Sequence, residues 1–403
     1  MPGVVTPLPG EAASPVSRAR HAAIIFALAF GGFAIGVSEF SIMGLMPNVA
    51  SDFGITEQAV GRLISVYALG VVVGAPTMAL LGGRVKRKTM LMALMLLYAI
   101  ANLASALAPD YRWMLIARFV SGLPHGAFFG LAALVAASVS TPGQRGAAVA
   151  KVMFGITLAL LIGNPLAVGI GQSLSWRYAF YAVSAGALIT AVLIAISLPP
   201  RQEGQAPSMR QELRDFHRAE VWLALLVGSV GFSGLFCVFS YMAPTMTNVT
   251  GVSEHWIPFG VATFGVGSLL GAQVGGWMFD RFGSRAVSLS LIGAVVVLLL
   301  YFFAVRSPLS VIPGIVLVGT MGTLVPIMQI HLLDVARDAQ GLASASNQAA
   351  LNVANALGPW FGGLAITAGL GWASTGLVGA TLSLAALLIW SLAPARLKRA
   401  EVL

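Results

Sequence analysis

Three ionisable side chains lie inside long apolar stretches of this sequence, where a charge is costly. Glu39 is the only ionisable residue between Ala22 and Met46, and Arg118 and His125 share another apolar stretch. Moving a charge into lipid costs several kcal/mol unless the charge is paired or neutralised. Residues of these types therefore indicate chemistry within a membrane, either the binding and release of a proton or the recognition of a polar molecule.

The combination of an acid and a base predicts a proton-coupling group. Burial favours the protonated form of a carboxyl and a nearby arginine favours the ionised form, so Glu39 beside Arg118 could titrate around neutral pH. Glu39 lies eight residues before Pro47 and Arg118 eight residues after Asp110, which gives the two side chains a comparable depth. We expect this pair to couple proton movement to the passage of a substrate. The alternatives are a permanent structural pair, a Glu39 that reaches the outer surface, and an Arg118 that holds its helix to carbonyls of the first span.

The composition indicates which elements must position these residues. Apolar residues make up 58% of the chain and charged residues 9%, whereas soluble proteins carry roughly 25% charged residues. A bilayer core about 30 Å thick requires roughly 20 apolar residues per helix. The sequence therefore predicts an all-α membrane protein with twelve transmembrane helices, over residues 22–46, 58–81, 89–108, 113–138, 147–170, 178–198, 221–246, 256–279, 286–305, 309–331, 341–367 and 373–393.

Several classes of function are excluded by what the sequence lacks. Cys237 is the only cysteine, which excludes an internal disulfide and a thiolate metal cluster. No metal-ligand spacing, serine–histidine nucleophile pattern or phosphate-binding loop occurs. We therefore expect no metal, no cofactor and no enzymatic activity.

The net charge of +9 reflects topology rather than affinity for nucleic acid. We count 18 Lys and Arg residues on the side that holds both termini and three on the opposite side. Cytoplasmic connections collect positive charge. Both termini are therefore expected in the cytoplasm, in a multi-pass protein of the cell membrane whose partner is the lipid bilayer.

The chain is expected to consist of two related halves. The predicted division is a cytoplasmic tail (1–21), a six-helix bundle (22–198), a cytoplasmic linker (199–220), a second six-helix bundle (221–393) and a second tail (394–403). Three pairs of landmarks recur at nearly one spacing, namely Arg84 and Arg281, Pro165 and Pro359, and Trp176 and Trp372. Parallel repeats of six spans describe one transporter architecture, with two pseudo-symmetric bundles around a central cavity.

Particular segments carry a resemblance to one family. The string GWMFDRFGSR (276–285) contains the pattern G-x-x-x-D-R-x-G-x-R in full, and ALLGGRVKRK (79–88) is its counterpart, with Gly83 at the acidic position and Lys86 at the glycine position. The strings ARFVSGLPHGAFFG (117–130) and GPWFGG (358–363) add to the pattern. The chain resembles the major facilitator superfamily, and within it the arabinose-efflux-permease branch of drug:proton-antiporter-like proteins.

The resemblance implies a gating loop and helix breaks. The gating loop would comprise Arg84, Asp280, Arg281 and Arg285, although ordinary solvated charges at a helix end are the alternative. Gly276 is expected to let its helix approach a neighbour closely, and Gly283 to permit a tight turn. Proline interrupts the hydrogen bonds of a helix, so Pro165, Gly358 and Pro359 are expected to let helices rock against each other. Simple packing is the alternative reading for all three.

Further residues are candidates for the wall of the substrate cavity, with simple packing as the alternative for His125, Phe128 and Met242 and an interfacial position as the alternative for Tyr241 and Gln329. They are His125, Tyr241, Gln329, Phe128 and Met242. Asn352 and Asn355 share a helical face, and we expect them to bond across helices or to the backbone near Pro359.

The predicted function is a secondary transporter, functional as a monomer, that exports a drug-like molecule, a sugar or a sugar derivative by proton antiport. Export rather than import follows from the resemblance alone. The alternatives are a proton-coupled or facilitative importer of a small nutrient, and a membrane-embedded sensor or enzyme.

Overall fold

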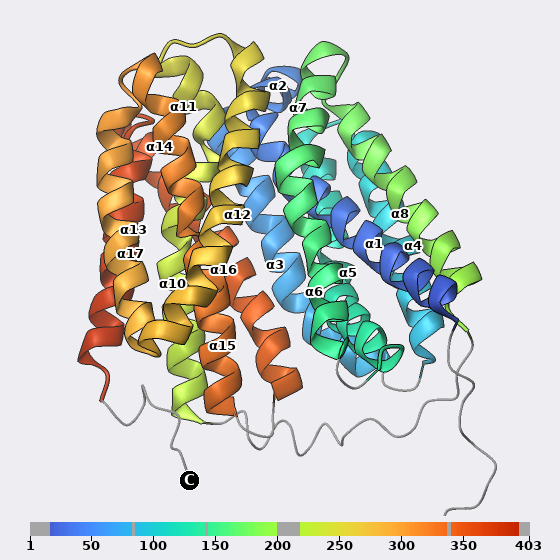
Figure 1. Ribbon diagram of the computed structural model, residues 1–403. Coiled ribbons are helices and arrows are strands. Elements are labelled where there is room, and N and C mark those ends of the chain that lie inside the picture. Colours follow the sequence, from blue (N-terminus) through green and yellow to red (C-terminus); the bar gives the residue numbers. More distant parts are fainter. Residues whose placement is uncertain (1–16, 83–84, 142–143, 200–217, 337–339, 395–403) are drawn as a thin grey trace, which may run out of the picture.

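The computed structural model describes residues 17–82, 85–141, 144–199, 218–336 and 340–394 (Figure 1). Within these ranges the secondary structure is helical, without strands. Twelve of the helical segments found there are long and apolar enough to cross a membrane. The predicted all-α fold with twelve spans is therefore confirmed. The predicted tails and linker lie mostly outside the described residues.

The first six spans are formed by α1 (Arg18–Gly44), α3 (Glu57–Gly82), α4 (Arg87–Ala106), α5 (Tyr111–Ser138), α6 with η2 and α7 (Arg145–Leu158, Ala159–Gly163, Asn164–Ser173) and α8 (Arg177–Ser197). The short helix α2 (Met46–Phe53) follows α1. We call the face at which α1 begins the terminal face and the opposite face the outer face.

The last six spans repeat this arrangement. They are formed by α10 (Ala219–Ser240), η3 with α12 (Glu254–Trp256, Ile257–Phe282), α13 (Arg285–Ala304), α14 with η4 and α15 (Pro308–Thr320, Met321–Thr323, Leu324–Ala336), α16 with η5 (Gln340–Ala365, Ile366–Leu370) and α17 (Ser374–Leu392). The short helix α11 (Met242–Asn248) follows α10.

The predicted seventh span, 221–246, is wrong at its outer end. The helix α10 stops at Ser240, and α11 continues after Tyr241. Pro244 causes this break because it lacks the N–H that would bond to the carbonyl of Ser240, whereas proline is tolerated in the first turn of a new helix. The same break occurs at the corresponding place in the first half, where Leu45 separates α1 from α2.

Glycines bring the second and fourth spans of each half into backbone contact. A Cβ on Gly70 of α3 would collide with the carbonyl of Phe119 in α5, and a Cβ on Gly122 would collide with that of Tyr67. The second half repeats these contacts at the corresponding positions, where Gly267 of α12 and Gly319 of α14 meet the partner backbone. Such close contacts need small residues, and their repetition supports an internal duplication.

The two halves meet toward the outer face. α3 packs against α16, where the hydroxyl of Ser65 donates to the carbonyl of Ala356 at 2.8 Å. α12 packs against η2 and α7, and the Gln172 amide donates to the carbonyl of Glu254 at 3.0 Å. Opening the protein toward the outer face would require these contacts to break.

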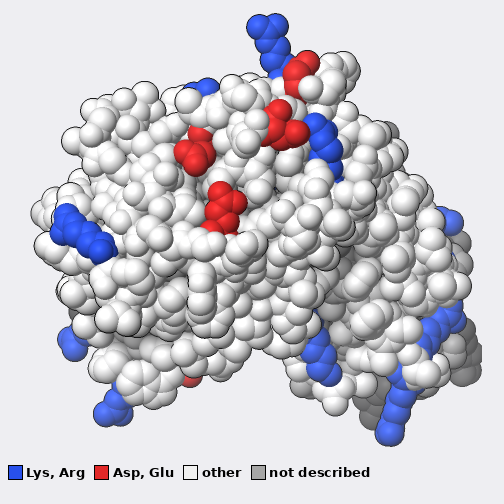
Figure 2. Space-filling view, turned by 90° about the horizontal axis from the view of Figure 1, so that it is seen from above, with Lys and Arg blue, Asp and Glu red and all other residues white. Residues whose placement is uncertain are grey.

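The outer face carries a group of acidic side chains (Figure 2). Seen from the outer face, the acidic side chains gather near the middle, and most Lys and Arg side chains in view lie toward the edge (Figure 2). The outer connections of the sequence supply Asp52, Glu57, Asp110 and Glu254. Acidic outer connections agree with a predominance of basic residues at the terminal face.

Candidate functional site

Glu39 lies in the protein interior and contacts the opposite half of the molecule. Its side chain is 5% exposed, and Oε1 accepts a hydrogen bond of 2.9 Å from Nδ2 of Asn355 in α16. On the same helix, a Cβ on Gly36 would lie 2.7 Å from Cβ of Ala159 in η2. The small residues of α1 thus bring it against its neighbours, and the acid joins α1 to α16.

Arg118 is fully buried and binds the backbone of α1. Its Nη1 donates to the carbonyl of Ser38 at 3.1 Å and to the Ser38 hydroxyl at 3.2 Å. Its guanidinium lies over the ring of Tyr67, 4.1 Å from the centroid, in cation–π geometry. Within the described ranges Nε and Nη2 have no hydrogen-bond partner. Arg118 therefore holds its helix to a carbonyl of the first span, which was one of the alternatives given for it in the sequence analysis.

Glu39 and Arg118 do not form an ion pair among the residues that the structure describes, because no N–O distance between them falls within 4.0 Å. The guanidinium is nevertheless the cation whose field acts on the Glu39 carboxyl. The carboxyl therefore has one direct partner, the neutral amide of Asn355. A hydrogen bond to an ionised acceptor is roughly twice as strong as one between neutral groups. The strength of this link between the halves thus depends on whether Glu39 holds a proton.

A polar network that the sequence analysis missed surrounds Arg118. The Ser38 hydroxyl donates to Oδ1 of Asn102 at 2.6 Å, and Nδ2 of Asn102 donates to the carbonyl of Tyr98. The hydroxyls of Tyr98 and Tyr67 are 3.1 Å apart, and Tyr67 OH is 2.9 Å from Nδ1 of His125. The network joins α1, α3, α4 and α5. Its one sequence signal was the spacing of Tyr98 and Asn102, four residues apart in an apolar span.

His125 and Phe128 lie inside the first half. His125 is 1% exposed, bonds to Tyr67 and packs edge-on against Phe129 with ring centroids 5.3 Å apart. Phe128 is buried, and a Cβ on Gly31 of α1 would collide with the tip of its ring and with Thr190 of α8. Phe128 thus packs between helices of one bundle, and its proposed contact with substrate stays a prediction.

Tyr241 lies where the two halves meet. It is fully buried, its hydroxyl donates to the carbonyl of Pro359 at 2.8 Å, and the hydroxyl also lies directly against Gly61 of α3. The neighbouring Met242 is likewise buried. Gln329 is half-buried on α15 and accepts a 2.7 Å hydrogen bond from Asn347. The contact of these three residues with substrate stays a prediction.

Phenylalanine side chains of the two halves pack together at Phe40, the residue after Glu39. Phe40 stacks on Phe236 of α10 with centroids 6.3 Å apart, and it lies 6.1 Å from the ring of Phe239. Phe239 stacks on Phe264 of α12 at 3.7 Å. The residue that follows Glu39 in α1 therefore packs against aromatic side chains of the second half.

The residues of the predicted gating loop lie at the terminal face. The side chains of Asp280, Arg281 and Arg285 are exposed and have no hydrogen bond or ion pair to any other described residue, whereas Arg84 lies outside the described residues. Gly283 has φ +55°, so it permits the predicted tight turn.

The expected role of Gly276 in close helix packing is wrong. A Cβ on Gly276 would have no atom within 4 Å, whereas a Cβ on Gly275 would meet the carbonyl of Thr323. Successive positions of a helix are about 100° apart around its axis, so Gly275 faces the neighbouring helix and Gly276 does not.

One of the predicted helix breaks, Pro165, adjoins irregular backbone, whereas Gly358 and Pro359 lie within a continuous helix. Pro165 follows the π-helix η2, which widens the span before the residue that lacks an N–H. A Cβ on Gly265 of α12 would lie 2.7 Å from the carbonyl oxygen of Leu160, so η2 contacts the other half. Pro359 lies inside α16, and a Cβ on Gly358 would lie 2.6 Å from the backbone N of Cys237. Their part in a rocking motion stays a prediction.

Comparison with known families and proteins places this geometry among transporters. The family model described as Major Facilitator Superfamily matches residues 28–253 and 234–402. The Inner membrane transport protein YdhP of Escherichia coli (strain K12) is 36% identical over 366 residues, which cover 91% of this chain and 94% of that protein. The Putative transporter AraJ of the same strain is 34% identical over 366 residues, with 90% and 93% covered. A Chloramphenicol resistance protein of Streptomyces lividans is 30% identical over 375 residues, with 90% and 95% covered.

Solved structures share the fold at low sequence identity. A D-xylose–proton symporter has a TM-score of 0.74 and 20% identity, with 94% of this chain and 99% of that chain covered. This similarity concerns the arrangement of the helices alone.

Proposed function

Since the chain belongs to the major facilitator superfamily, it is a membrane transporter rather than an enzyme, and we propose that it exports a small molecule by proton antiport. The proposed cargo is a drug-like molecule, a sugar or a sugar derivative. Similarity to a protein named for chloramphenicol resistance supports export. The proposed location is the cell membrane with both termini in the cytoplasm, because positive charge gathers at the terminal side.

The observation that carries the proposal is the hydrogen bond between Glu39 and Asn355. It joins a titratable group of the first half to a neutral amide of the second half, in the layer where the halves meet. Loss of the proton from Glu39 strengthens this bond, and gain of a proton weakens it. The protonation state of Glu39 therefore sets the strength of a contact that must break when the protein opens toward the outer face and form again when it closes.

Arg118 has a positioning role in this mechanism. It fixes the segment beside Glu39 through the carbonyl and hydroxyl of Ser38, and it places a positive charge near the carboxyl without bonding to it. Glu39 remains able to exchange its proton, whereas a direct ion pair would hold it ionised. The His125–Tyr67–Tyr98 network fixes Arg118 from the other side through the ring of Tyr67.

The conformational change is proposed as rocking of the two bundles, 22–198 and 221–393, about the cleft between them. A proton moving down its gradient resets the transporter after cargo has left toward the outer side. Asp280, Arg281 and Arg285, with Arg84, are proposed to latch the terminal side when it closes. The exposure of Asp280, Arg281 and Arg285 in the present state agrees with a latch that is disengaged while the outer side is closed.

The test uses the protein reconstituted in proteoliposomes with an imposed pH gradient. Uphill transport would be measured against a panel of sugars, nucleoside-like compounds and lipophilic drugs, for the wild type and Glu39→Gln. We expect the wild type to accumulate a cargo against its gradient and Glu39→Gln to support only downhill movement. Glu254→Gln makes the same chemical change at an exposed outer position and should transport like the wild type. Uphill transport by Glu39→Gln would refute the role of this residue, and cargo moving in the same direction as protons would refute antiport.

A further inference from the structure

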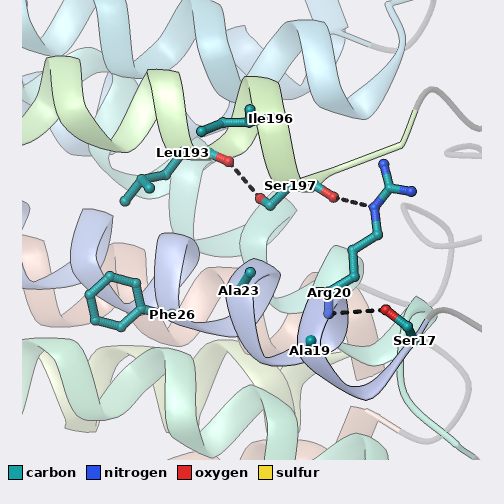
Figure 3. Close-up of a pocket in the computed structure, with 8 residues that line it drawn as sticks. All are labelled: Ser17, Ala19, Arg20, Ala23, Phe26, Leu193, Ile196 and Ser197. Atoms are coloured by element: carbon teal, nitrogen blue, oxygen red, sulfur yellow. Dashed lines mark hydrogen bonds between the residues drawn. The ribbon is translucent and has the colours of Figure 1, made fainter.

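A groove opens between the first turns of α1 and the last turns of α8, at the terminal face and far from Glu39 (Figure 3). Its volume is about 470 Å³, within the range of roughly 300–1,000 Å³ that is usual for ligand sites. Its wall includes Arg20, Ala23 and Phe26 from α1 and Leu193 and Ile196 from α8. Nothing in the transport mechanism uses these residues.

Arg20 lies at the polar end of the groove with part of its guanidinium available. Its Nε donates to the carbonyl of Ser197 at 2.9 Å, which holds the side chain across from α1 to α8. Figure 3 shows the two terminal nitrogens directed away from this bond, and neither has a partner among the residues described. A guanidinium held in one orientation presents two parallel donors, which suits a phosphate group.

The other end of the groove is apolar. Phe26 is 61% exposed and Ile196 is 68% exposed, and Leu193 lies one turn from Ile196 on the same helix. Phe26 is six residues beyond Arg20, or roughly 9 Å along the helix axis toward the interior of the membrane. An occupant must therefore be anionic at the surface and hydrocarbon below it, which describes a phospholipid rather than a free phosphate.

The local charge favours an anion. No acidic residue occurs between positions 12 and 38, and Lys88 lies close by, where its ammonium donates to the carbonyl of Ala195 in α8. The second half offers a contrast. Arg218, which precedes the first helix of that half, lies 3.8 Å from the carboxylate of Glu220, so its charge is largely compensated.

We propose that this groove binds an anionic glycerophospholipid. The phosphate accepts hydrogen bonds from the terminal nitrogens of Arg20, and one acyl chain lies along Phe26, Leu193 and Ile196. The lipid joins the start of the helix that carries Glu39 to the end of α8. The site does not depend on the cargo or on proton coupling.

The test is native mass spectrometry of the full-length protein released from detergent, titrated with phosphatidylglycerol or with phosphatidylcholine of the same acyl chains. The wild type should retain one phosphatidylglycerol in preference to phosphatidylcholine. Arg20→Gln should weaken that first binding about five-fold, the factor that one basic residue contributes near an anionic surface. Ala23→Phe fills the groove without changing the charge and should also reduce it. Arg218→Gln is the control and should bind like the wild type.

Three results would overturn the proposal. Equal retention of the two lipids would mean that acyl chains alone are recognised. An equal loss in Arg20→Gln and Arg218→Gln would mean that the general positive charge of the terminal face attracts the lipid. Retention that is insensitive to both Arg20→Gln and Ala23→Phe would mean that the groove holds something else, such as the chain's own residues 1–16. Midpoints of thermal unfolding measured for each variant identify any protein that has not folded.

Discussion

Replacing Asn355 with leucine tests the link between the two halves. The substitution nearly preserves the side-chain volume and removes the donor to Oε1 of Glu39. We expect the outer-closed state to lose population relative to an outer-open state, because only the closed state contains this bond.

The size of the effect follows from the geometry. When Glu39 is ionised, a hydrogen bond to its carboxylate contributes about 1.5–3 kcal/mol, which corresponds to a roughly ten- to 150-fold change in the ratio of the two states. Overall stability should change much less. Leucine also removes the Oδ1 of Asn355, a buried acceptor without a partner in the described part of the chain, and this gain offsets part of the lost bond.

The assay is a distance measurement between spin labels on the outer face. Leu107 at the end of α4 and Leu309 at the start of α14 belong to different halves and are 60% and 90% exposed. Each can be replaced by cysteine for labelling, and the native Cys237 is buried and should remain unlabelled. The wild type should give mainly the short distance, and Asn355→Leu should give a larger fraction of long distances.

The control is Asn352→Leu, the same change three residues earlier. The Asn352 amide donates to the carbonyl of Gln348 within its own helix, so its loss should not shift the distances. Combining Asn355→Leu with Glu39→Gln should add little to the larger of the two single effects. An unchanged distribution in Asn355→Leu, an equal shift in Asn352→Leu, or fully additive effects of the pair would each refute the reasoning.

Three further predictions concern other contacts. Arg118→Lys should lower the midpoint of thermal unfolding and abolish uphill transport, because an ammonium lacks the planar guanidinium that binds Ser38 and covers the Tyr67 ring. A variant with the unfolding midpoint and the uphill transport of the wild type would contradict this prediction. Gly265→Ala should raise the long-distance fraction in the same labelling assay, because its Cβ would lie 2.7 Å from the Leu160 carbonyl oxygen. The control Gly276→Ala should not raise it, because a Cβ there meets no atom within 4 Å. Equal behaviour of the two variants would count against a close contact at η2. Asp52→Asn should destabilise the protein by less than about 1 kcal/mol, since its 2.9 Å ion pair with Arg177 is partly exposed; chemical unfolding at low and high salt checks both the size and the expected screening.

The number of spans was predictable because the length of an apolar run is set by the thickness of the membrane. The end of the seventh span was not predicted correctly. Pro244 marked the break, but the apolar run continues through the proline. The choice of Gly276 over Gly275 failed for a related reason: a motif gives the residue types but not which of two adjacent positions faces the neighbour.

The sequence indicated some residues of the candidate site, such as Glu39 and Arg118, but not which residues would pair. The burial of Glu39 follows from the cost of exposing a carboxyl to lipid. Its partner Asn355 lies in the other half of the chain, and the pattern of one helix does not identify which helix of the other half lies opposite. The alternative of a permanent pair with Arg118 was also compatible with the sequence. Tyr67 and Tyr98 were missed because a lone tyrosine in an apolar span is also typical of packing.

The glycine contacts that recur in both halves have a consequence for how the protein can be assembled. Each half holds its second and fourth helices together with its own backbone, as Gly70 and Gly122 do in one and Gly267 and Gly319 do in the other. Each half also begins and ends at the same face. The two halves should therefore insert into the membrane and pair when they are produced as separate polypeptides in one cell. The covalent connection between them would then serve to keep their amounts equal.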